Sequence, residues 1–347
     1  MSELAAIRRT YPPDAQVGVR IVDVPIALYT NEPRLLTSLR DYFAPYLVER
    51  PAWDAHRVFV MQGEPPYDAA RLRDVSRAPG KSVKEAFYDT VDARIVVKRR
   101  TGVAIYVAEP DHYVIGDLVT NFNQAVNAVM MVFAKAMLQR SFVMLHASAV
   151  LAEAGGIAFA SPSGSGKSTM ALALVEYRYQ FVTNDRLFVR CVNGYGAEMV
   201  GVPKRPRVNP GTLFWLPRLA PLATSEERSR YASLRAEELW TVEQKHDVDV
   251  DAIYGPGTVH LQGKLTAMYL LRWSPVDHGW DVRSLGAAER RAALDQMIKR
   301  VTIYDTVPPQ AGELRAVNAV ADMVSMYEVT GRADVGRLTD FVLTQAQ

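Results

Sequence analysis

The order of hydrophobic and polar residues predicts mainly strands in the first third of the chain. Apolar, β-branched runs bounded by polar or turn-forming residues are typical of strands. The strands predicted in this way cover residues 18–29, 57–61, 93–98 and 103–108. Gly102 lies between the last two and predicts a hairpin turn, because glycine adopts a positive φ without steric cost. One helix is predicted, over residues 32–46, from apolar side chains at helical spacing.

After about residue 120 the pattern changes to alternating strands and helices. A long helix is predicted over residues 121–139, and proline and glycine predict an irregular segment over 205–212. The remaining predicted strands cover 142–151, 156–160, 181–183, 187–192 and 265–272, and the remaining helices cover 167–177, 287–300 and 314–327. This alternation is typical of an α/β domain. We therefore predict an N-terminal α+β domain over residues 1–120 and an α/β domain over residues 121–347.

Composition and charge argue against several classes of protein. The 347 residues are enough for about two domains, and 49% hydrophobic with 22% charged residues excludes a disordered or collagen-like chain. The 40 basic and 38 acidic residues leave a net charge of +2, so neither a nucleic acid nor a membrane partner is expected. The single Cys191 cannot form an internal disulfide, and no apolar run resembles a signal peptide or a bilayer span. We expect a soluble, cytoplasmic protein.

The segment from Ser161 to Thr169, SPSGSGKST, matches most of a phosphate-binding P-loop. It lies between a predicted strand and a predicted helix, as the motif G-x-x-x-x-G-K-[ST] requires, with Ser161 in place of the first glycine. Backbone N–H groups at such a helix N-terminus bind phosphates. The residues expected to bind nucleotide are Ser163, Gly164, Ser165, Gly166, Lys167, Ser168 and Thr169. Lys167 is expected to contact the β and γ phosphates and Ser168 to bind Mg²⁺. The alternative is a Gly/Ser-rich turn with an incidental lysine.

Asp185 is the first acidic residue that follows a predicted strand after the P-loop. A carboxylate in this position is suited to hold Mg²⁺, to take a proton from an incoming hydroxyl, or to do both. The alternative is a turn aspartate that hydrogen-bonds its own backbone.

The run from His146 to Val189 resembles the catalytic domain of HPr kinase/phosphorylase. The resemblance rests on His146, on S-G-S-G-K-S at residues 163–168 and on Asn184-Asp185-Arg186, which occur in that order. Over the whole chain, including GVPKRPRVNPGT at 201–212, the sequence is most similar to HPr-kinase-related kinase B, a group found beside an ATP-grasp enzyme. The resemblance implies a P-loop on a mixed sheet related to that of phosphoenolpyruvate carboxykinase, transfer of phosphate from ATP to a hydroxyl, and an ATP-grasp enzyme as a possible partner.

Three features depart from the family's pattern. Ser161 replaces the first P-loop glycine, Asn184 replaces one of two acidic residues, and the family's E-x-R-G segment is Glu198-Met199-Val200-Gly201 without its arginine. The resemblance therefore implies kinase chemistry, and it does not carry over HPr as the acceptor or the phosphorylase reaction. His146 matches the family's active-site histidine, although its apolar neighbours are also typical of a core histidine.

Three basic residues in the irregular segment, Lys204, Arg205 and Arg207, are candidates to bind the acceptor, with a solvated basic loop as the alternative. The sequence thus predicts an ATP- and Mg²⁺-dependent kinase with catalytic residues Asp185, His146 and Lys167, and with Ser168 and Asp185 at the metal. The acceptor would be a Ser or Thr hydroxyl of a protein or peptide, or a small metabolite. The alternative is a nucleotide-binding regulatory or scaffolding protein with little turnover, and the oligomeric state is left open.

Overall fold

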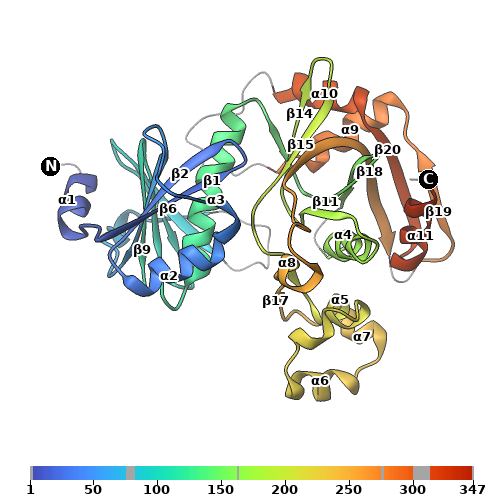
Figure 1. Ribbon diagram of the computed structural model, residues 1–347, viewed down its shortest axis with the longest axis horizontal. Coiled ribbons are helices and arrows are strands. Elements are labelled where there is room, and N and C mark those ends of the chain that lie inside the picture. Colours follow the sequence, from blue (N-terminus) through green and yellow to red (C-terminus); the bar gives the residue numbers. More distant parts are fainter. Residues whose placement is uncertain (1–2, 76–82, 162–163, 275–276, 300–312, 346–347) are drawn as a thin grey trace. The chain divides into compact units, whose positions relative to one another are not determined.

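The computed structural model describes residues 3–75, 83–161, 164–274, 277–299 and 313–345. It is a mixed α/β structure, and the chain divides into two compact units after Gln139 (Figure 1). This division comes one helix later than the expected boundary at residue 120. Helix α3 (Phe122–Gln139) belongs to the first unit, because it packs against three strands of that unit's sheet, β2, β4 and β9.

The first unit is built on one sheet with the strand order β3-β1-β2-β4-β9-β8-β7-β6-β5. Strand β4 runs parallel to both of its neighbours, and the other pairs are antiparallel. The strands are β1 (Ala15–Ile21), β2 (Val24–Thr30), β3 (Leu47–Val48), β4 (His56–Gln62), β5 (Arg73–Asp74), β6 (Glu85–Asp89), β7 (Arg94–Lys98), β8 (Ala104–Val107) and β9 (Asp111–Gly116). The hairpin predicted at Gly102 is confirmed, with φ at 70°. The single strand predicted over 18–29 is wrong: the chain turns at Val22 and forms the β1–β2 hairpin.

Helices cover both faces of this sheet. Ile7 of α1 (Glu3–Thr10) packs with Ile95 and Tyr106 in a buried cluster on one face. Helix α3 covers the opposite face. Val58 and Val60, alternate residues of β4, are fully buried on that face. Helix α2 (Pro33–Tyr42) lies against β1 and β2.

The second unit also has a mixed sheet, with the order β10-β14-β15-β18-β12-β11-β13 and with β20 joining β18 to β19. Its strands are β10 (Val143–Leu145), β11 (Ala147–Ala152), β12 (Gly155–Ala160), β13 (Gln180–Thr183), β14 (Leu187–Val192), β15 (Gly196–Gly201), β18 (Gln262–Ser274), β19 (Trp280–Ser284) and β20 (Ser325–Arg332). Its longer helices are α4 (Lys167–Val175), α9 (Ala287–Met297), α10 (Glu313–Met323) and α11 (Val335–Gln345).

Two hydrophobic clusters fill the two faces of this sheet. Helices α4 and α11 cover one face, where Met170 and Leu338 pack with Phe159 of β12. Helices α9 and α10 cover the other face, where Leu294 and Val320 pack with further strand residues. Because β12 and its neighbours are buried on both faces, their sequences are continuous apolar runs.

A smaller group of elements follows β15 and includes short helices (Figure 1). It contains β16 (Arg207–Val208), α5 (Pro210–Trp215), α6 (Ser225–Ala232), α7 (Ala236–Thr241), β17 (His246–Asp247) and α8 (Val250–Tyr254). Strands β16 and β17 pair with each other. The expectation that 205–212 is irregular is therefore only partly right, because Pro210 occupies the first turn of α5, a position that proline tolerates.

Three other predicted elements need correction. The strand predicted over 142–151 is interrupted at His146, where the chain passes from the β10–β14 ladder to the β11–β12 ladder. The helix predicted over 287–300 ends at Met297, because Ile298 pairs with Leu145. The helix predicted over 314–327 ends at Met323, and β20 follows, because residues 325–332 pair with β18.

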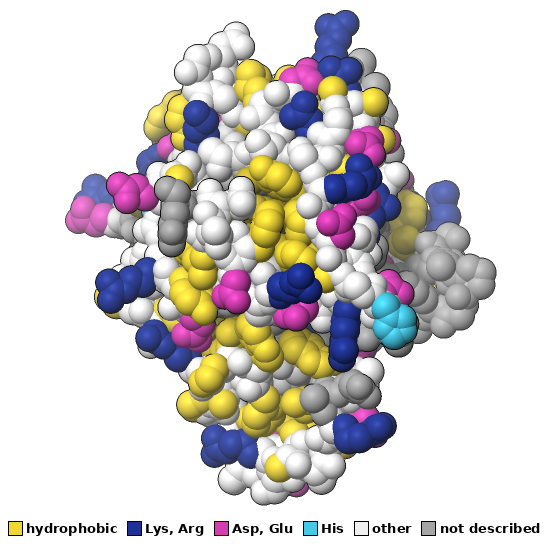
Figure 2. Space-filling model, turned by 90° about the vertical axis from the view of Figure 1, so that its right-hand side faces the viewer, with side chains coloured by type: hydrophobic (Ala, Val, Ile, Leu, Met, Phe, Trp, Pro, Cys, Tyr) yellow, Lys and Arg dark blue, Asp and Glu magenta, His cyan; other side chains and the backbone are white. Residues whose placement is uncertain are grey.

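The surface of the second unit shows no dominant charge on the face in Figure 2. Basic and acidic side chains are interspersed there around a central band of hydrophobic ones. This distribution agrees with the net charge of +2. Among the described helices, none is long and apolar enough to cross a membrane.

Candidate nucleotide-binding and catalytic site

The sheet of the second unit brings the main predicted site residues to one edge. Strand β11 pairs antiparallel with both β12 and β13, so β12 and β13 run in the same direction and end at the same edge. Ser161 follows the end of β12, and Asn184 and Asp185 follow the end of β13. His146 immediately precedes β11 and therefore lies at this edge as well.

The predicted P-loop forms a turn from the end of β12 into α4. Gly164 and Gly166 have φ values of 88° and 85°, in the left-handed region where glycine is favoured. Helix α4 begins at Lys167, directly after Gly166. The predicted nucleotide-binding residue Ser163 lies outside the described residues. The described part of the loop has the strand–turn–helix context that phosphate binding requires.

Lys167 is buried at the start of α4, and its side chain turns back over the loop. Its Nζ donates a hydrogen bond to the backbone carbonyl of Ser161 at 2.8 Å. Burial lowers the pKa of Lys167 to about 8; the Asp185 carboxylate opposes this shift and the charge of Lys299 adds to it. The ammonium is thus close enough to Asp185 for their charges to interact.

The other loop side chains are held by different elements. The Ser168 hydroxyl lies 3.4 Å from the carbonyl oxygen of Asn184, the residue that precedes Asp185 in the sequence. Ser168 therefore lies near the turn that contains Asp185. Thr169 is buried, and its hydroxyl hydrogen-bonds that of Thr212 in α5 at 2.7 Å, so its side chain is directed to α5. The carbonyl of Ser165 accepts a 2.9 Å hydrogen bond from the indole of a tryptophan at the end of β18.

That tryptophan, Trp273, is a supporting residue that the sequence analysis missed. Besides bonding Ser165, its ring would lie 3.6 Å from a Cβ placed on Gly166. Trp273 therefore fixes the loop from the neighbouring strand. No local motif identifies it, because its role depends on the parallel pairing of β18 with β12.

Asp185 is held by two partners. Its Oδ1 lies 3.1 Å from Nε2 of His146, and its Oδ2 accepts a 2.7 Å hydrogen bond from Nζ of Lys299. Arg186 lies farther away, with Nε 3.7 Å from Oδ2. Burial alone would raise the pKa of the Asp185 carboxyl, but the hydrogen bond with His146 and the charge and hydrogen bond of Lys299 outweigh it and hold the pKa well below its ordinary value. Asp185 is therefore a carboxylate at neutral pH.

Lys299 reaches the site through a short extended segment after α9. Its backbone N–H donates to the carbonyl of Met144 at 2.8 Å, and Ile298 forms a bridge with Leu145. The His146 N–H donates to the carbonyl of Met297 at 2.8 Å. The same pairing therefore positions both Lys299 and His146, the two partners of Asp185.

The three basic residues of the predicted acceptor-binding segment have different surroundings. Lys204 is half-buried; burial lowers its pKa to about 8, as do the charges of Arg186 and Arg207, while Asp185 opposes the shift. Arg205 forms an ion pair with Asp249 at 2.8 Å, and Arg207 forms one with Asp247 at 3.0 Å. The charge of Lys204 interacts with that of Asp185.

Ser168 and Asp185 supply a hydroxyl and a carboxylate, the oxygen ligands that suit Mg²⁺ bound largely through nucleotide phosphates. The donor set fits the predicted ion. Among the described residues, no group of three or more His, Cys, Asp or Glu side chains is placed to hold a metal.

Gly201, at the end of β15, shows how closely β13 is packed. A Cβ at this position would lie 2.1 Å from the carbonyl oxygen of Val182. Any larger residue would displace β13, the strand that ends two residues before Asp185.

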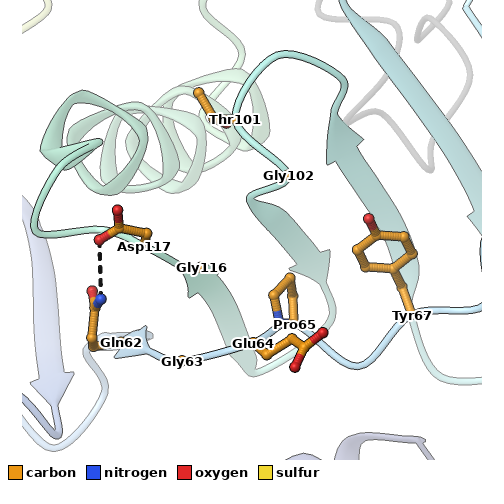
Figure 3. Close-up of a pocket in the computed structure, with 9 residues that line it drawn as sticks. All are labelled: Gln62, Gly63, Glu64, Pro65, Tyr67, Thr101, Gly102, Gly116 and Asp117. Atoms are coloured by element: carbon orange, nitrogen blue, oxygen red, sulfur yellow. Dashed lines mark hydrogen bonds between the residues drawn. The ribbon is translucent and has the colours of Figure 1, made fainter.

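The first unit has a separate open pocket of about 620 Å³ (Figure 3). Its lining consists of Gln62, Gly63, Glu64, Pro65, Tyr67, Thr101, Gly102, Gly116 and Asp117. The side chain of Gln62 donates to Asp117 at 3.0 Å. The sequence-predicted site residues lie elsewhere, in the second unit.

Comparison with known proteins gives little that bears on this site. No protein-family model matches the chain, and no curated protein matches its sequence. Among solved structures, the chain is similar to the HPr(Ser) kinase/phosphatase from Coxiella burnetii, with 12% sequence identity and a TM-score of 0.29. The match covers 58% of this chain and 86% of that one. The interpretation of the site therefore rests on its own geometry.

Proposed function

We propose that the second unit is an ATP-dependent phosphotransferase that passes the γ-phosphate to a hydroxyl. One observation carries the proposal: the loop with Lys167 and Ser168 and the carboxylate of Asp185 lie together at one sheet edge. A phosphate-binding loop supplies the donor site, and a carboxylate beside it supplies the group that phosphoryl transfer needs to orient the incoming hydroxyl.

The chain's own residues have distinct parts in this proposal. The N–H groups at the start of α4 and the ammonium of Lys167 bind and neutralise the phosphates. Because its pKa is lowered, Asp185 is a weak base. Its main part is therefore to orient the acceptor hydroxyl, and it does not remove the proton early in the transfer. His146 holds one carboxylate oxygen and fixes the direction of the other.

Mg²⁺, held by Ser168 and Asp185, would neutralise charge on the transferring phosphate when bound. The acceptor would be a Ser or Thr hydroxyl of a protein or peptide, or a small hydroxylated metabolite.

Transfer from labelled ATP tests the proposal. The purified full chain is incubated with γ-labelled ATP, Mg²⁺ and a cell lysate, and label is followed into proteins and small molecules. We expect wild-type protein and a Lys264→Met control, which changes an exposed lysine of β18, to transfer label. Lys167→Ala should abolish transfer, because it removes the loop's cation. Equal transfer by Lys167→Ala protein would refute the assignment.

A second candidate function is a nucleotide-binding regulatory protein with little turnover. The specific observation in its favour is that both oxygens of Asp185 are already engaged, by His146 and Lys299. Tight ATP binding without transfer to any lysate component would favour this candidate.

A further inference from the structure

The candidate site holds several cations that enter from outside the P-loop. Lys299 follows α9, Arg186 precedes β14 and Lys204 follows β15. The Nζ of Lys299 is 2.7 Å and the Nε of Arg186 is 3.7 Å from the same oxygen of Asp185. Lys204 stands near enough for its charge to interact with both Arg186 and Asp185. The carboxylate of Asp247 also acts on the charge of Lys204. Lys299 and Arg186 share the one carboxylate of Asp185, which leaves an excess of positive charge beside it.

Arg186 also has a hydrogen-bond donor without an acceptor. Its Nε is buried, and among the described residues it makes no hydrogen bond, since 3.7 Å to Asp185 is too long for one. A buried donor left unpaired is unfavourable, because it has lost its hydrogen bonds to water without replacing them. An anion bound beside Asp185 would accept this hydrogen bond and would balance the excess charge.

We propose that Arg186, Lys204 and Lys299 form an anion subsite for the acceptor. The acceptor is then a small compound that carries a carboxylate or phosphate group close to the hydroxyl that is phosphorylated. The interpretation of the bound anion as part of the phosphate acceptor rests on the proposed function. Two cations that share one carboxylate, with Lys204 nearby, fit a compact anionic group better than the uncharged backbone of a peptide.

The proposed reaction transfers the γ-phosphate of ATP to the acceptor hydroxyl. The acceptor oxygen forms a bond to the γ-phosphorus, and the bond from that phosphorus to the bridging oxygen of ATP breaks. The electron pair of the broken bond leaves with ADP, and the proton of the acceptor hydroxyl passes to Asp185 and then to solvent. The anion subsite holds the unreacting end of the acceptor and so fixes the hydroxyl near Asp185.

Calorimetric titration tests the subsite with simple probes. The full chain is first saturated with Mg²⁺ and a nonhydrolysable ATP analogue, so that the P-loop is filled. Orthophosphate and glycolate, which carry the two kinds of anionic group, are then titrated in separate experiments. We expect at least one to bind, and we expect Lys299→Met and Arg186→Met each to weaken that binding at least tenfold.

Two controls separate charge from folding. Lys299→Arg keeps the cation and should stay within about threefold of wild type, and the exposed-lysine variant Lys264→Met should not differ from wild type. The preferred probe, phosphate or carboxylate, identifies the acceptor's group.

Three results would overturn the subsite: no binding of either probe at tens of millimolar, binding that both Met variants leave unchanged, or an equal loss of analogue affinity. The last result would mean that the cations clamp the nucleotide. If the analogue does not bind but orthophosphate does, and its binding still depends on Lys299 and Arg186 in a Lys167→Ala background, the subsite is supported and the proposed function fails.

Discussion

The lowered pKa of Lys167 predicts that nucleotide binding is linked to proton uptake. In the free protein this pKa is about 8, because the side chain is buried at the start of α4. Bound phosphates favour the charged ammonium and raise its pKa. Only the protonated form binds well, so affinity is constant below pH 7 and falls as pH rises through 8.

The size of the effect follows from this value. Between pH 7.5 and 9.5 the free protein loses most of the Lys167 proton, and ATP affinity should fall about 25-fold, or about 2 kcal/mol. At pH 8 binding should take up about half a proton. The terminal phosphate, with a second pKa near 6, is already ionised over this range and does not contribute.

Calorimetry in two buffers with different ionisation enthalpies measures both the affinity and the proton uptake. Lys167→Met should bind weakly and lose the pH dependence. Lys204→Met should keep it, although the pKa of Lys204 is also about 8, because Lys204 lies outside the P-loop. Affinity that stays flat from pH 7.5 to 9.5 in the wild type, or an unchanged slope in Lys167→Met, would refute the reasoning.

Three other changes have definite expected outcomes. Asp185→Asn should leave nucleotide binding measurable but slow transfer by about two to four orders of magnitude, because the carboxylate charge is lost; a rate within a few-fold of wild type would place the catalytic role elsewhere. Burial lowers the pKa of His112 to about 4, so His112 is neutral in the folded protein. The free energy of unfolding should therefore fall by about 2 kcal/mol between pH 7 and pH 5. His112→Leu should remove this loss in urea denaturation, and the same acid sensitivity in the variant would exclude His112 as its source. Gly201→Ala should destabilise the second unit by about 3 kcal/mol, because its Cβ would clash with the Val182 carbonyl, and an unchanged midpoint of thermal unfolding would contradict this packing.

The sequence was most informative where one segment contains the whole feature. The turn predicted to be a P-loop is such a case, because Gly164, Gly166 and Lys167 lie within four consecutive residues and their left-handed turn and helix start are local properties. The hairpin at Gly102 is another. Asp185 could also be predicted as a candidate, because β13 and the turn after it are the next elements after the loop and its helix.

Features that depend on pairing between segments far apart in the sequence could not be predicted. Lys299 lies 114 residues from Asp185, and the apolar spacing of 287–300 favours a helix to its end. The helix instead stops at Met297, because pairing with β10 satisfies the backbone of the next residues. The break at His146 has the same origin, since two different ladders meet there. Neither strand pairing is encoded in the local hydrophobic pattern.

Calorimetric titration of the full chain with Mg²⁺ and a nonhydrolysable ATP analogue at pH 7.5 tests the central claim most directly. The account predicts one binding site per chain, which Lys167→Ala weakens at least tenfold and which the exposed-lysine variant Lys264→Met leaves unchanged. Absence of binding in the wild type, or binding that Lys167→Ala does not weaken, would contradict it.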